Sequence, residues 1–274
     1  MIVIQSDELR TLLEALRAAY GYDFTDYAEV SVKRRVTSFM TKKNIVAIDI
    51  LQDTLLKNDV IFEEFIREIS VTVTEMFRDP SFYRALREKV VNRLKTYPFI
   101  KIWLAGCATG EEVYSLAILL KEEGVLQRSV IYATDINQGS LQLAREGIYP
   151  LDYMKNYTSN YQKAGGKANF SDYYMAKFGS ALFDQNLREN VVFSSHNLAT
   201  EKSFNEFHMI ICRNVLIYFN QQLQSRVIGL FYDSLVPFGF LGLGSKESLL
   251  FAANRADFME IDRREKIYMK ENVK

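Results

Sequence analysis

Short apolar segments alternate with segments of helical periodicity from about residue 98 onward. Helical spacing of apolar residues follows Glu111 and recurs near Ser140–Glu146 and over Gln221–Leu235. The strand candidates between them are Phe99–Leu104, Val130–Thr134, Val191–Phe193, Phe207–Cys212, Phe238–Leu243 and Glu265–Met269. Strands that alternate with helices predict an α/β fold, in which a mainly parallel sheet has helices on both faces.

The first part of the chain shows only helical patterns. Leucines recur at helical spacing after Ser6, and Gly21 predicts the end of that helix. Further helical faces follow, the last of them over Phe62–Ile69. We therefore expect a helical N-terminal domain over residues 1–70 and a second domain over residues 71–274.

The strand and helix patterns fail between residues 148 and 188, inside the second domain. Tyrosines are frequent there, at Tyr149, Tyr153, Tyr157, Tyr161, Tyr173 and Tyr174. An insertion of this length in an α/β domain is usually functional or a subdomain of its own. Tyrosine side chains suit contact with a protein partner, and they equally suit the interior of a small antiparallel flap. We expect an inserted subdomain and leave both roles open.

The charge balance argues against a general nucleic-acid binder. Lys+Arg and Asp+Glu both total 34, so the formal net charge is zero, whereas neutralising phosphates requires a basic excess. Two cysteines are too few for a disulfide framework or a zinc cluster, which favours a reducing cytoplasm and no bound metal. No apolar stretch approaches the roughly 18 residues of a membrane span, and the N-terminus lacks a signal-peptide pattern. A cytoplasmic protein without membrane insertion is expected.

The turn Leu104–Glu112, with the sequence LAGCATGEE, lies between a predicted strand and a predicted helix. Ligands of doubly wound sheets bind at the carboxyl ends of the strands. Gly106 and Gly110 allow a tight turn that approaches a ligand closely. Because NAD, FAD and other ligands also use glycine-rich turns, this feature alone predicts only a nucleotide-like ligand.

Two acids at the end of this turn narrow the choice of ligand. Dinucleotides place a pyrophosphate at such a helix N-terminus, where Glu111 and Glu112 would repel it. The same acids suit an amine or a sulfonium, and S-adenosylmethionine carries both without a phosphate. Stabilisation of the helix dipole is the simpler alternative for either glutamate. Asp135, at the end of the next strand, is suited to bind ribose hydroxyls or, alternatively, to cap a helix.

Five motifs occur in order along the chain, at Ser70–Pro80, Leu104–Tyr114, Asp135, His196–Leu198 and Ile211–Phe219. Taken together they resemble the CheR family of chemotaxis receptor methyltransferases, over nearly the whole chain. The resemblance implies an all-α N-terminal domain and a Rossmann-like methyltransferase domain, with the inserted β-subdomain at 148–188. It also implies methyl transfer from S-adenosylmethionine to glutamate side chains of chemotaxis receptors, with S-adenosylhomocysteine as the product.

The resemblance further implies roles for individual residues. Contacts to the cofactor are implied for Thr72, Thr74, Arg78, Glu111, Asp135, Asn197, Leu198, Arg213 and Asn214. Glu111 is preferred to Glu112 as the acidic ligand. Tyr218 is implied as a catalytic residue near the methyl group, and Arg93 is the nearest candidate for a family arginine. A core ring for Tyr218 and a solvated helix charge for Arg93 are the structural alternatives.

Two positions depart from the family pattern, since Thr72 stands where the family has asparagine and Val113 replaces its proline. These departures keep open a noncatalytic signalling module that binds a receptor or S-adenosylhomocysteine. A methyltransferase that acts on another substrate is the second alternative.

The second predicted helix, after Asp26, carries Lys33, Arg34 and Arg35. Methylation regions of receptors are acidic helical bundles in the family, so these residues are candidates for receptor docking, with a solvated charge run as the alternative. The reaction itself needs no general base, because a glutamate with a pKa of about 4.3 is ionised at neutral pH. We expect Tyr218, together with an arginine, to orient the substrate carboxylate.

Overall fold

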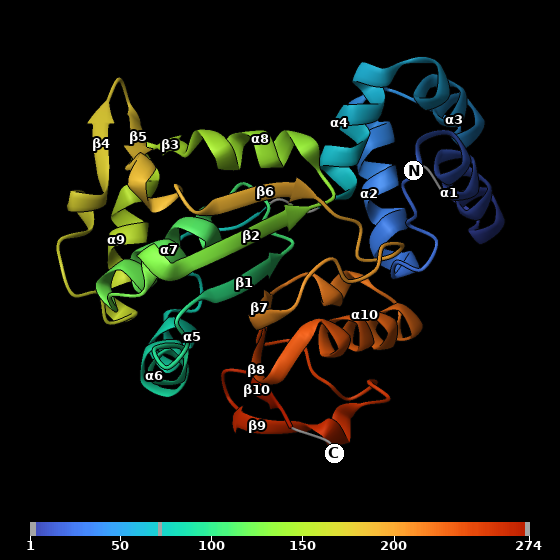
Figure 1. Ribbon diagram of the computed structural model, residues 1–274. Coiled ribbons are helices and arrows are strands. Elements are labelled where there is room, and N and C mark those ends of the chain that lie inside the picture. Colours follow the sequence, from blue (N-terminus) through green and yellow to red (C-terminus); the bar gives the residue numbers. More distant parts are fainter. Residues whose placement is uncertain (1–3, 71–72, 272–274) are drawn as a thin grey trace.

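The computed structural model describes residues 4–70 and 73–271. Figure 1 shows the N-terminal helices at one end of the molecule, the main sheet in the middle and a small sheet at the other end. The N-terminal helices are α1 (Ser6–Tyr20), α2 (Glu29–Lys42), α3 (Ile48–Lys57) and α4 (Asp59–Ile69). Among the helices described, none combines the length and hydropathy needed to span a membrane.

The N-terminal helices form where the leucine and phenylalanine spacing predicted them. Leu9, Leu12, Leu13 and Leu16 bury one face of α1, which ends at Gly21 in the left-handed conformation with φ 77°. Asn58 begins α4 by accepting a hydrogen bond from the Ile61 N–H. The buried faces of the four helices share one hydrophobic core. The all-α expectation is confirmed, and α3 is an additional helix that the sequence analysis did not identify.

Within the described residues the main sheet has seven strands in the order β6-β2-β1-β7-β8-β10-β9. They are β1 (Ile100–Ala105), β2 (Ser129–Asp135), β6 (Val191–Ser195), β7 (Phe207–Cys212), β8 (Leu235–Leu243), β9 (Phe258–Asp262) and β10 (Ile267–Lys270). The first five strands of this order pair in parallel, and β10 is antiparallel to both β8 and β9. The predicted mainly parallel sheet is confirmed. The sequence analysis missed β9, an edge strand in which only Phe258 is buried.

The order of the strands creates a crevice beside the central strand. The chain runs from β1 outward to β2 and β6, and it then returns to the opposite side of β1 to form β7 and β8. Helical segments that separate these strands are α7 (Glu111–Glu122), α8 (Gln138–Glu146) and α10 (Gln221–Ser234). In such a sheet, ligands bind at the carboxyl ends of the strands where the order reverses. Here that point lies between β1 and β7.

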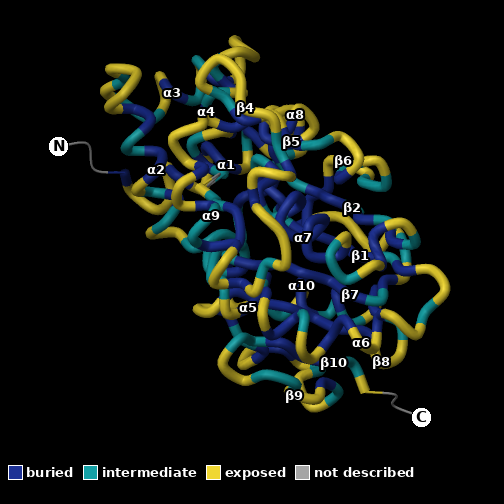
Figure 2. Tube along the Cα trace, turned by 90° about the vertical axis from the view of Figure 1, so that its left-hand side faces the viewer, coloured by how far each residue is buried: buried dark blue, intermediate teal, exposed yellow. Residues whose placement is uncertain are grey.

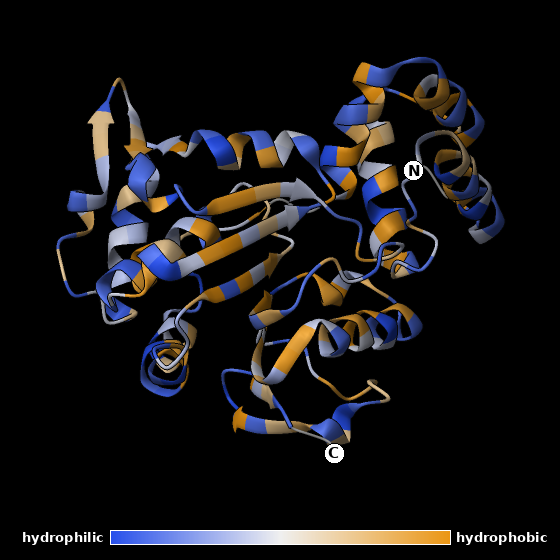
Figure 3. Cartoon of the chain, in the orientation of Figure 1, coloured by the Kyte–Doolittle hydropathy of each residue, from blue (hydrophilic) through white to orange (hydrophobic). Residues whose placement is uncertain are grey.

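Hydrophobic cores cover both faces of the sheet. Successive residues of β1 point to opposite faces, so that Leu104 packs in the cluster that contains α7 residues and Trp103 packs in the cluster that contains α10 residues. Figure 2 shows the buried residues concentrated along β1, β2 and β7, and Figure 3 shows hydrophobic and hydrophilic residues side by side along α8 and α10. A sheet buried on both faces holds the carboxyl ends of its strands rigidly.

The inserted segment is a small antiparallel sheet with one helix packed beside it. Its elements are β3 (Ile148–Pro150), α9 (Met154–Lys163), β4 (Tyr174–Lys177) and β5 (Ser180–Phe183), with the strand order β3-β5-β4. The side chains of Tyr149, Tyr157, Tyr161 and Tyr173 are buried. Interior packing, one of the two roles considered for these tyrosines, is therefore confirmed for these four, whereas Tyr153 is about half exposed.

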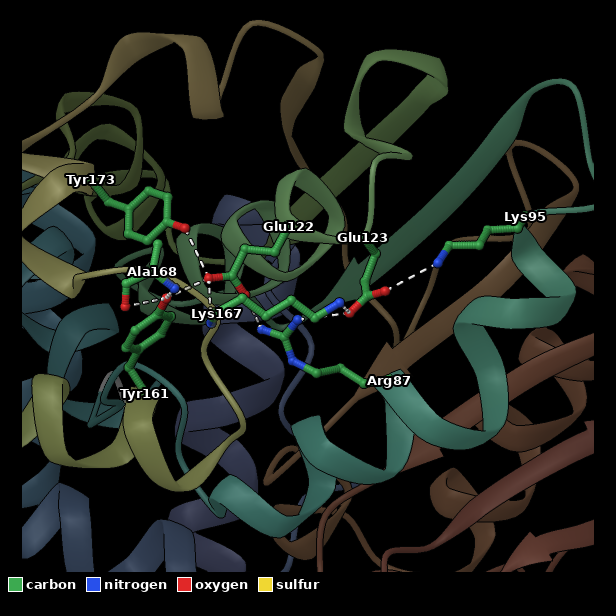
Figure 4. A network of polar contacts seen from close by, with 8 residues as sticks. All are labelled: Arg87, Lys95, Glu122, Glu123, Tyr161, Lys167, Ala168 and Tyr173. Atoms are coloured by element: carbon green, nitrogen blue, oxygen red, sulfur yellow. Dashed lines mark hydrogen bonds and ion pairs between the residues drawn. The ribbon is translucent and has the colours of Figure 1, made fainter.

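A network of charges ties the inserted segment to the main domain at the C-terminal end of α7 (Figure 4). Glu123 forms ion pairs of 3.0 Å with Arg87, 3.1 Å with Lys95 and 2.6 Å with Lys167. Arg87 lies in a π-helical segment, Leu86–Val90, which joins α5 (Pro80–Ala85) to α6 (Val91–Leu94). The neighbouring Glu122 pairs with Arg87 and accepts hydrogen bonds from Tyr161, Tyr173 and the Lys167 N–H.

This network should make the stability of the protein depend on acid pH. Burial opposes ionisation of Glu123, but hydrogen bonds from Lys167, Lys95 and Arg87 outweigh it and lower its pKa to about 2. A carboxyl with a lowered pKa in the folded state stabilises the fold above its unfolded pKa of about 4.3, and this contribution is lost as the pH falls toward the folded value. We expect the wild type to exceed Glu123→Gln in unfolding free energy by about 1 kcal/mol near neutral pH, less than the full pKa shift implies, because solvent screens the pairs with the exposed lysines. Denaturant unfolding from neutral pH to about pH 2 should show this difference shrinking, and a constant difference would contradict the assignment.

Candidate functional site

A cavity lies at the carboxyl ends of the central strands, at the point where the strand order reverses. Its space is about 950 Å³, open solvent at its mouth included. Residues that follow β1, β2, β6 and β7 line it, together with the segment 73–78 and residues of the N-terminal helical part. The lining includes Thr74, Arg78, Asp135, Asn197, Leu198, Arg213, Asn214 and Tyr218. The structure thus brings these sequence-predicted residues together, whereas Thr72 lies outside the described residues.

The glycines of the turn after β1 have the predicted left-handed backbone, with φ 82° at Gly106 and φ 96° at Gly110. A Cβ at Gly106 would overlap Val215 in the loop after β7, and one at Gly110 would lie 2.8 Å from the Ala144 Cα. Both glycines are therefore required by neighbouring protein segments. Gly106 also lines the cavity, as expected for a glycine that lets the backbone approach a ligand, whereas Gly110 lies outside the lining.

The acid that lines the cavity is Glu112, and the preferred Glu111 lies outside the lining residues. Glu112 lines the cavity and accepts a 2.9 Å hydrogen bond from the Arg213 guanidinium. Glu111 is buried outside the lining residues, accepts a 2.6 Å hydrogen bond from the Thr109 hydroxyl, and has its pKa raised by burial. Consecutive helix residues point about 100° apart, which gives the two adjacent acids different surroundings here.

Asp135 is fixed by backbone groups on both sides. Its two carboxylate oxygens accept 2.9 Å hydrogen bonds from the N–H groups of Ala108 and Asn137. Burial raises the pKa of this carboxyl, and the backbone hydrogen bonds oppose that effect. The helix-cap alternative is wrong, because Asn137 caps α8 by accepting from the Ser140 N–H. Each oxygen of Asp135 keeps a further lone pair for a hydroxyl group in the cavity.

Arg213 joins the two sides of the cavity floor. Its guanidinium pairs with Glu112 at 2.9 Å and with Asp79 at 2.6 Å, and it lies 4.3 Å from the ring centroid of Phe82. The side chain is almost fully buried. Glu112 is therefore partly neutralised by Arg213. Asp135 also lines the cavity, and it forms no ion pair with any of the described residues.

Residues of the N-terminal part pack against the cavity and its lining residues, a contact that was not predicted from the sequence. Arg35 of α2 is buried, donates a hydrogen bond to the Ile69 carbonyl, and lies 4.5 Å from the ring centroid of Tyr218. Tyr27, which precedes α2, also lines the cavity and packs edge-on against Phe219 at 4.9 Å. Its neighbour Ala28 donates to the Tyr218 carbonyl. Helical periodicity gave no signal for these contacts between distant parts of the chain.

The other arginines and the lysine singled out in the sequence lie in different surroundings. Arg93 is exposed on α6 and stacks over Phe238 at 4.8 Å, so its predicted catalytic position is wrong and the solvated alternative holds. Arg34 is exposed, and Lys33 forms a 2.7 Å ion pair with Glu29. Arg35 is buried at the cavity and cannot belong to an exposed docking surface.

Comparisons with known proteins agree with this geometry. Residues 7–70 match the family model of the CheR methyltransferase all-alpha domain, and residues 72–266 match that of the CheR methyltransferase SAM binding domain. Cher3 of Pseudomonas putida, a presumed methyltransferase by name, is 47% identical over 263 residues, which cover 96% of each chain.

More distant relatives include the chemotaxis protein methyltransferase of Listeria innocua, which is 30% identical over 240 residues that cover 87% of each chain. Among solved structures, N-methyltransferase NodS from Bradyrhizobium japonicum aligns with a TM-score of 0.41 at 11% identity, over 72% of this chain and 89% of that chain. A structural similarity this low adds nothing to the assignment. The two domain matches show that the chain belongs to the CheR methyltransferase family.

Proposed function

We propose that this protein transfers a methyl group from S-adenosylmethionine to glutamate side chains of chemotaxis receptors. The products would be the glutamate methyl ester and S-adenosylhomocysteine. The observation that carries the proposal is the single cavity in which Asp135, Arg78 and Tyr218 meet. Membership of the CheR family and the name of the Listeria relative support methyl transfer in chemotaxis. A cytoplasmic location stays a prediction.

The chemistry of the residues that line the cavity fits S-adenosylmethionine. Asp135 is suited to accept hydrogen bonds from the ribose hydroxyls. With Glu75 and Glu112 it gives the lining three acids, against the two arginines Arg78 and Arg213. Arg78, whose described hydrogen bond goes only to the Val73 carbonyl, has further N–H donors for the cofactor's carboxylate. Asn197, Leu198 and Asn214 line the same space. We assign these residues, with Thr74 and Arg213, to the cofactor site.

When bound, S-adenosylmethionine supplies a methyl group on a positively charged sulfur, which leaves as a neutral thioether once the substrate carboxylate takes the methyl group. The protein needs no general base, because the substrate glutamate is already ionised. In this proposal the hydroxyl of Tyr218, which lines the cavity, donates a hydrogen bond that orients this carboxylate. Arg35 lies over the face of the Tyr218 ring and so holds that ring in position. Alignment and exclusion of water are the contributions of the chain.

Transfer of a radiolabelled methyl group tests the proposal against its two alternatives. The protein is incubated with labelled S-adenosylmethionine and with membranes that contain or lack chemotaxis receptors. Label in the receptor band supports the proposal. A protein that binds S-adenosylhomocysteine but transfers no label would be a signalling module, and label in other molecules alone would indicate another substrate.

Reversing the exposed charge on α2 tests the receptor-docking surface. We expect Arg34→Glu to lower receptor methylation about tenfold at low ionic strength, with a smaller effect at high salt, because charged surfaces steer association and salt screens them. Affinity for S-adenosylhomocysteine should not change, since Arg34 does not line the cavity. Arg264→Glu, which reverses a 91% exposed charge in the β9–β10 turn, is the matched control. Equal methylation by the two variants would exclude Arg34 from docking.

A further inference from the structure

A buried carboxylate outside the sequence motifs organises the loop that follows β7. Glu247 lies in the segment after β8 and is 4% exposed. One of its oxygens accepts hydrogen bonds from the N–H groups of Val215 at 2.8 Å and Leu216 at 2.7 Å. The other accepts from Asn214 at 3.0 Å and Gly244 at 2.6 Å. A single side chain therefore satisfies four backbone donors.

The loop held in this way carries two residues of the candidate site. Asn214 lines the cavity and adopts a left-handed backbone with φ 59°, a conformation that costs energy for a residue other than glycine. Tyr218 follows in the same loop, and its N–H bonds to the Val215 carbonyl at 3.1 Å. The three N–H groups of this loop that Glu247 binds belong to Asn214, Val215 and Leu216. They lead directly into the turn Leu216–Tyr218, which sets the position of the Tyr218 side chain. Displacing them would displace both cavity residues.

Only an ionised carboxylate suits this arrangement. A carboxylate presents acceptor lone pairs on both oxygens, whereas an amide of the same size presents acceptors on one side and donors on the other. Burial raises the pKa of Glu247, and the four backbone N–H groups oppose that effect. Glutamine at this position would direct N–H groups against two of the four backbone donors. The loop would then have to move or leave buried donors unpaired.

We propose that Glu247 is a positioning residue of the methyltransferase site, which holds Asn214 toward the cofactor and Tyr218 toward the substrate. The inference rests on the proposed function for the roles of Asn214 and Tyr218. Glu247 itself does not line the cavity, so it acts through the loop. A residue that only stabilised the fold would instead lower the melting temperature without changing the site of the folded molecules.

Glu247→Gln tests the proposal, with Glu260→Gln, an exposed position on β9, as the matched control. Calorimetry should show about tenfold weaker binding of S-adenosylhomocysteine to Glu247→Gln. This is the loss of affinity expected if the displaced loop loses about one hydrogen bond to the ligand. With receptor membranes, kcat should fall about 100-fold and KM for the receptor should change little, because a displaced Tyr218 misaligns bound substrate. The control should match the wild type in both measurements. All titrations are made at a temperature at which each variant is folded. The criterion is that the fluorescence of its Trp103, the single tryptophan of the chain, matches that of the folded wild type.

Binding and kcat of Glu247→Gln within twofold of the wild type, with only the melting temperature lowered, would overturn the proposal. If Glu247→Gln does not fold, Gly244→Ala decides, because a Cβ there would lie 2.7 Å from a Glu247 oxygen and 2.9 Å from the Asn214 nitrogen. It should weaken S-adenosylhomocysteine binding in the same direction, and unchanged binding would again overturn the proposal. Failure of the proposed function can be told apart from failure of the Glu247 proposal. In the first case the wild type does not methylate receptors, but the binding of S-adenosylhomocysteine to the variants still tests the role of Glu247.

Discussion

Asp135→Ala is expected to remove most of the affinity for S-adenosylhomocysteine. The substitution deletes the acceptors of the Ala108 and Asn137 N–H groups and, on the proposed function, the acceptors of the ribose hydroxyls. The unpaired backbone donors lower the stability of the fold, whereas the affinity falls by the lost ribose hydrogen bonds. Each hydrogen bond to a charged acceptor contributes about 1.5–3 kcal/mol, and every 1.4 kcal/mol is a tenfold loss of affinity. We therefore expect binding at least about 100-fold weaker by isothermal titration calorimetry.

The control for this variant is Asp172→Ala, an exposed aspartate of the inserted segment with no described side-chain partner. It should bind S-adenosylhomocysteine like the wild type. Asp135→Asn should be intermediate, because its amide oxygen replaces only one of the two carboxylate acceptors. Wild-type affinity in a folded Asp135→Ala would exclude this strand end from the cofactor site.

Tyr218→Phe should separate turnover from cofactor binding. The substitution keeps the ring that Arg35 covers at 4.5 Å and removes only the hydroxyl. A hydrogen bond to a charged group contributes about 1.5–3 kcal/mol, so loss of the proposed bond to the substrate carboxylate should lower kcat about 10- to 100-fold. Affinity for S-adenosylhomocysteine should stay within about twofold of the wild-type value. Full turnover together with full cofactor binding would remove Tyr218 from the mechanism.

Arg35→Met provides the companion measurement, because it keeps an unbranched side chain and loses the charge over the ring. If Arg35 acts through Tyr218, the double variant should lower kcat by less than the product of the two single effects. Independent effects would multiply and would show that Arg35 acts elsewhere. Tyr153→Phe, at an exposed tyrosine of the inserted segment, is the control for removal of a hydroxyl.

The sequence predicted the part of the site that one parallel sheet brings together. Asp135, Asn197 and Arg213 each follow a strand candidate, and parallel strands place such positions at one edge. The structure confirms that they line one cavity. The local sequence pattern was sufficient to predict this part of the site, because short apolar segments identified the strands. Parallel pairing then places the carboxyl ends of these strands at one edge of the sheet.

The rest of the site depends on packing that no local pattern contains. Glu111 and Glu112 were distinguishable only by the rotation of α7 against the sheet. Arg35 reaches Tyr218 across 183 residues of sequence, through packing of the helical part on the loop after β7. Arg93 lies beyond the π-helical turn at Leu86–Val90, which changes the rotation of the residues after it.

Peptide mass spectrometry of receptor-containing membranes, after incubation with the protein and S-adenosylmethionine, tests the central claim most directly. We expect methyl groups on glutamate side chains of the receptor, released by mild alkali as expected for esters. The Asp135→Ala protein should add none under the same conditions. Receptor glutamates left unmodified by folded wild-type protein that binds the cofactor, or methyl groups found only on other residue types, would contradict the account.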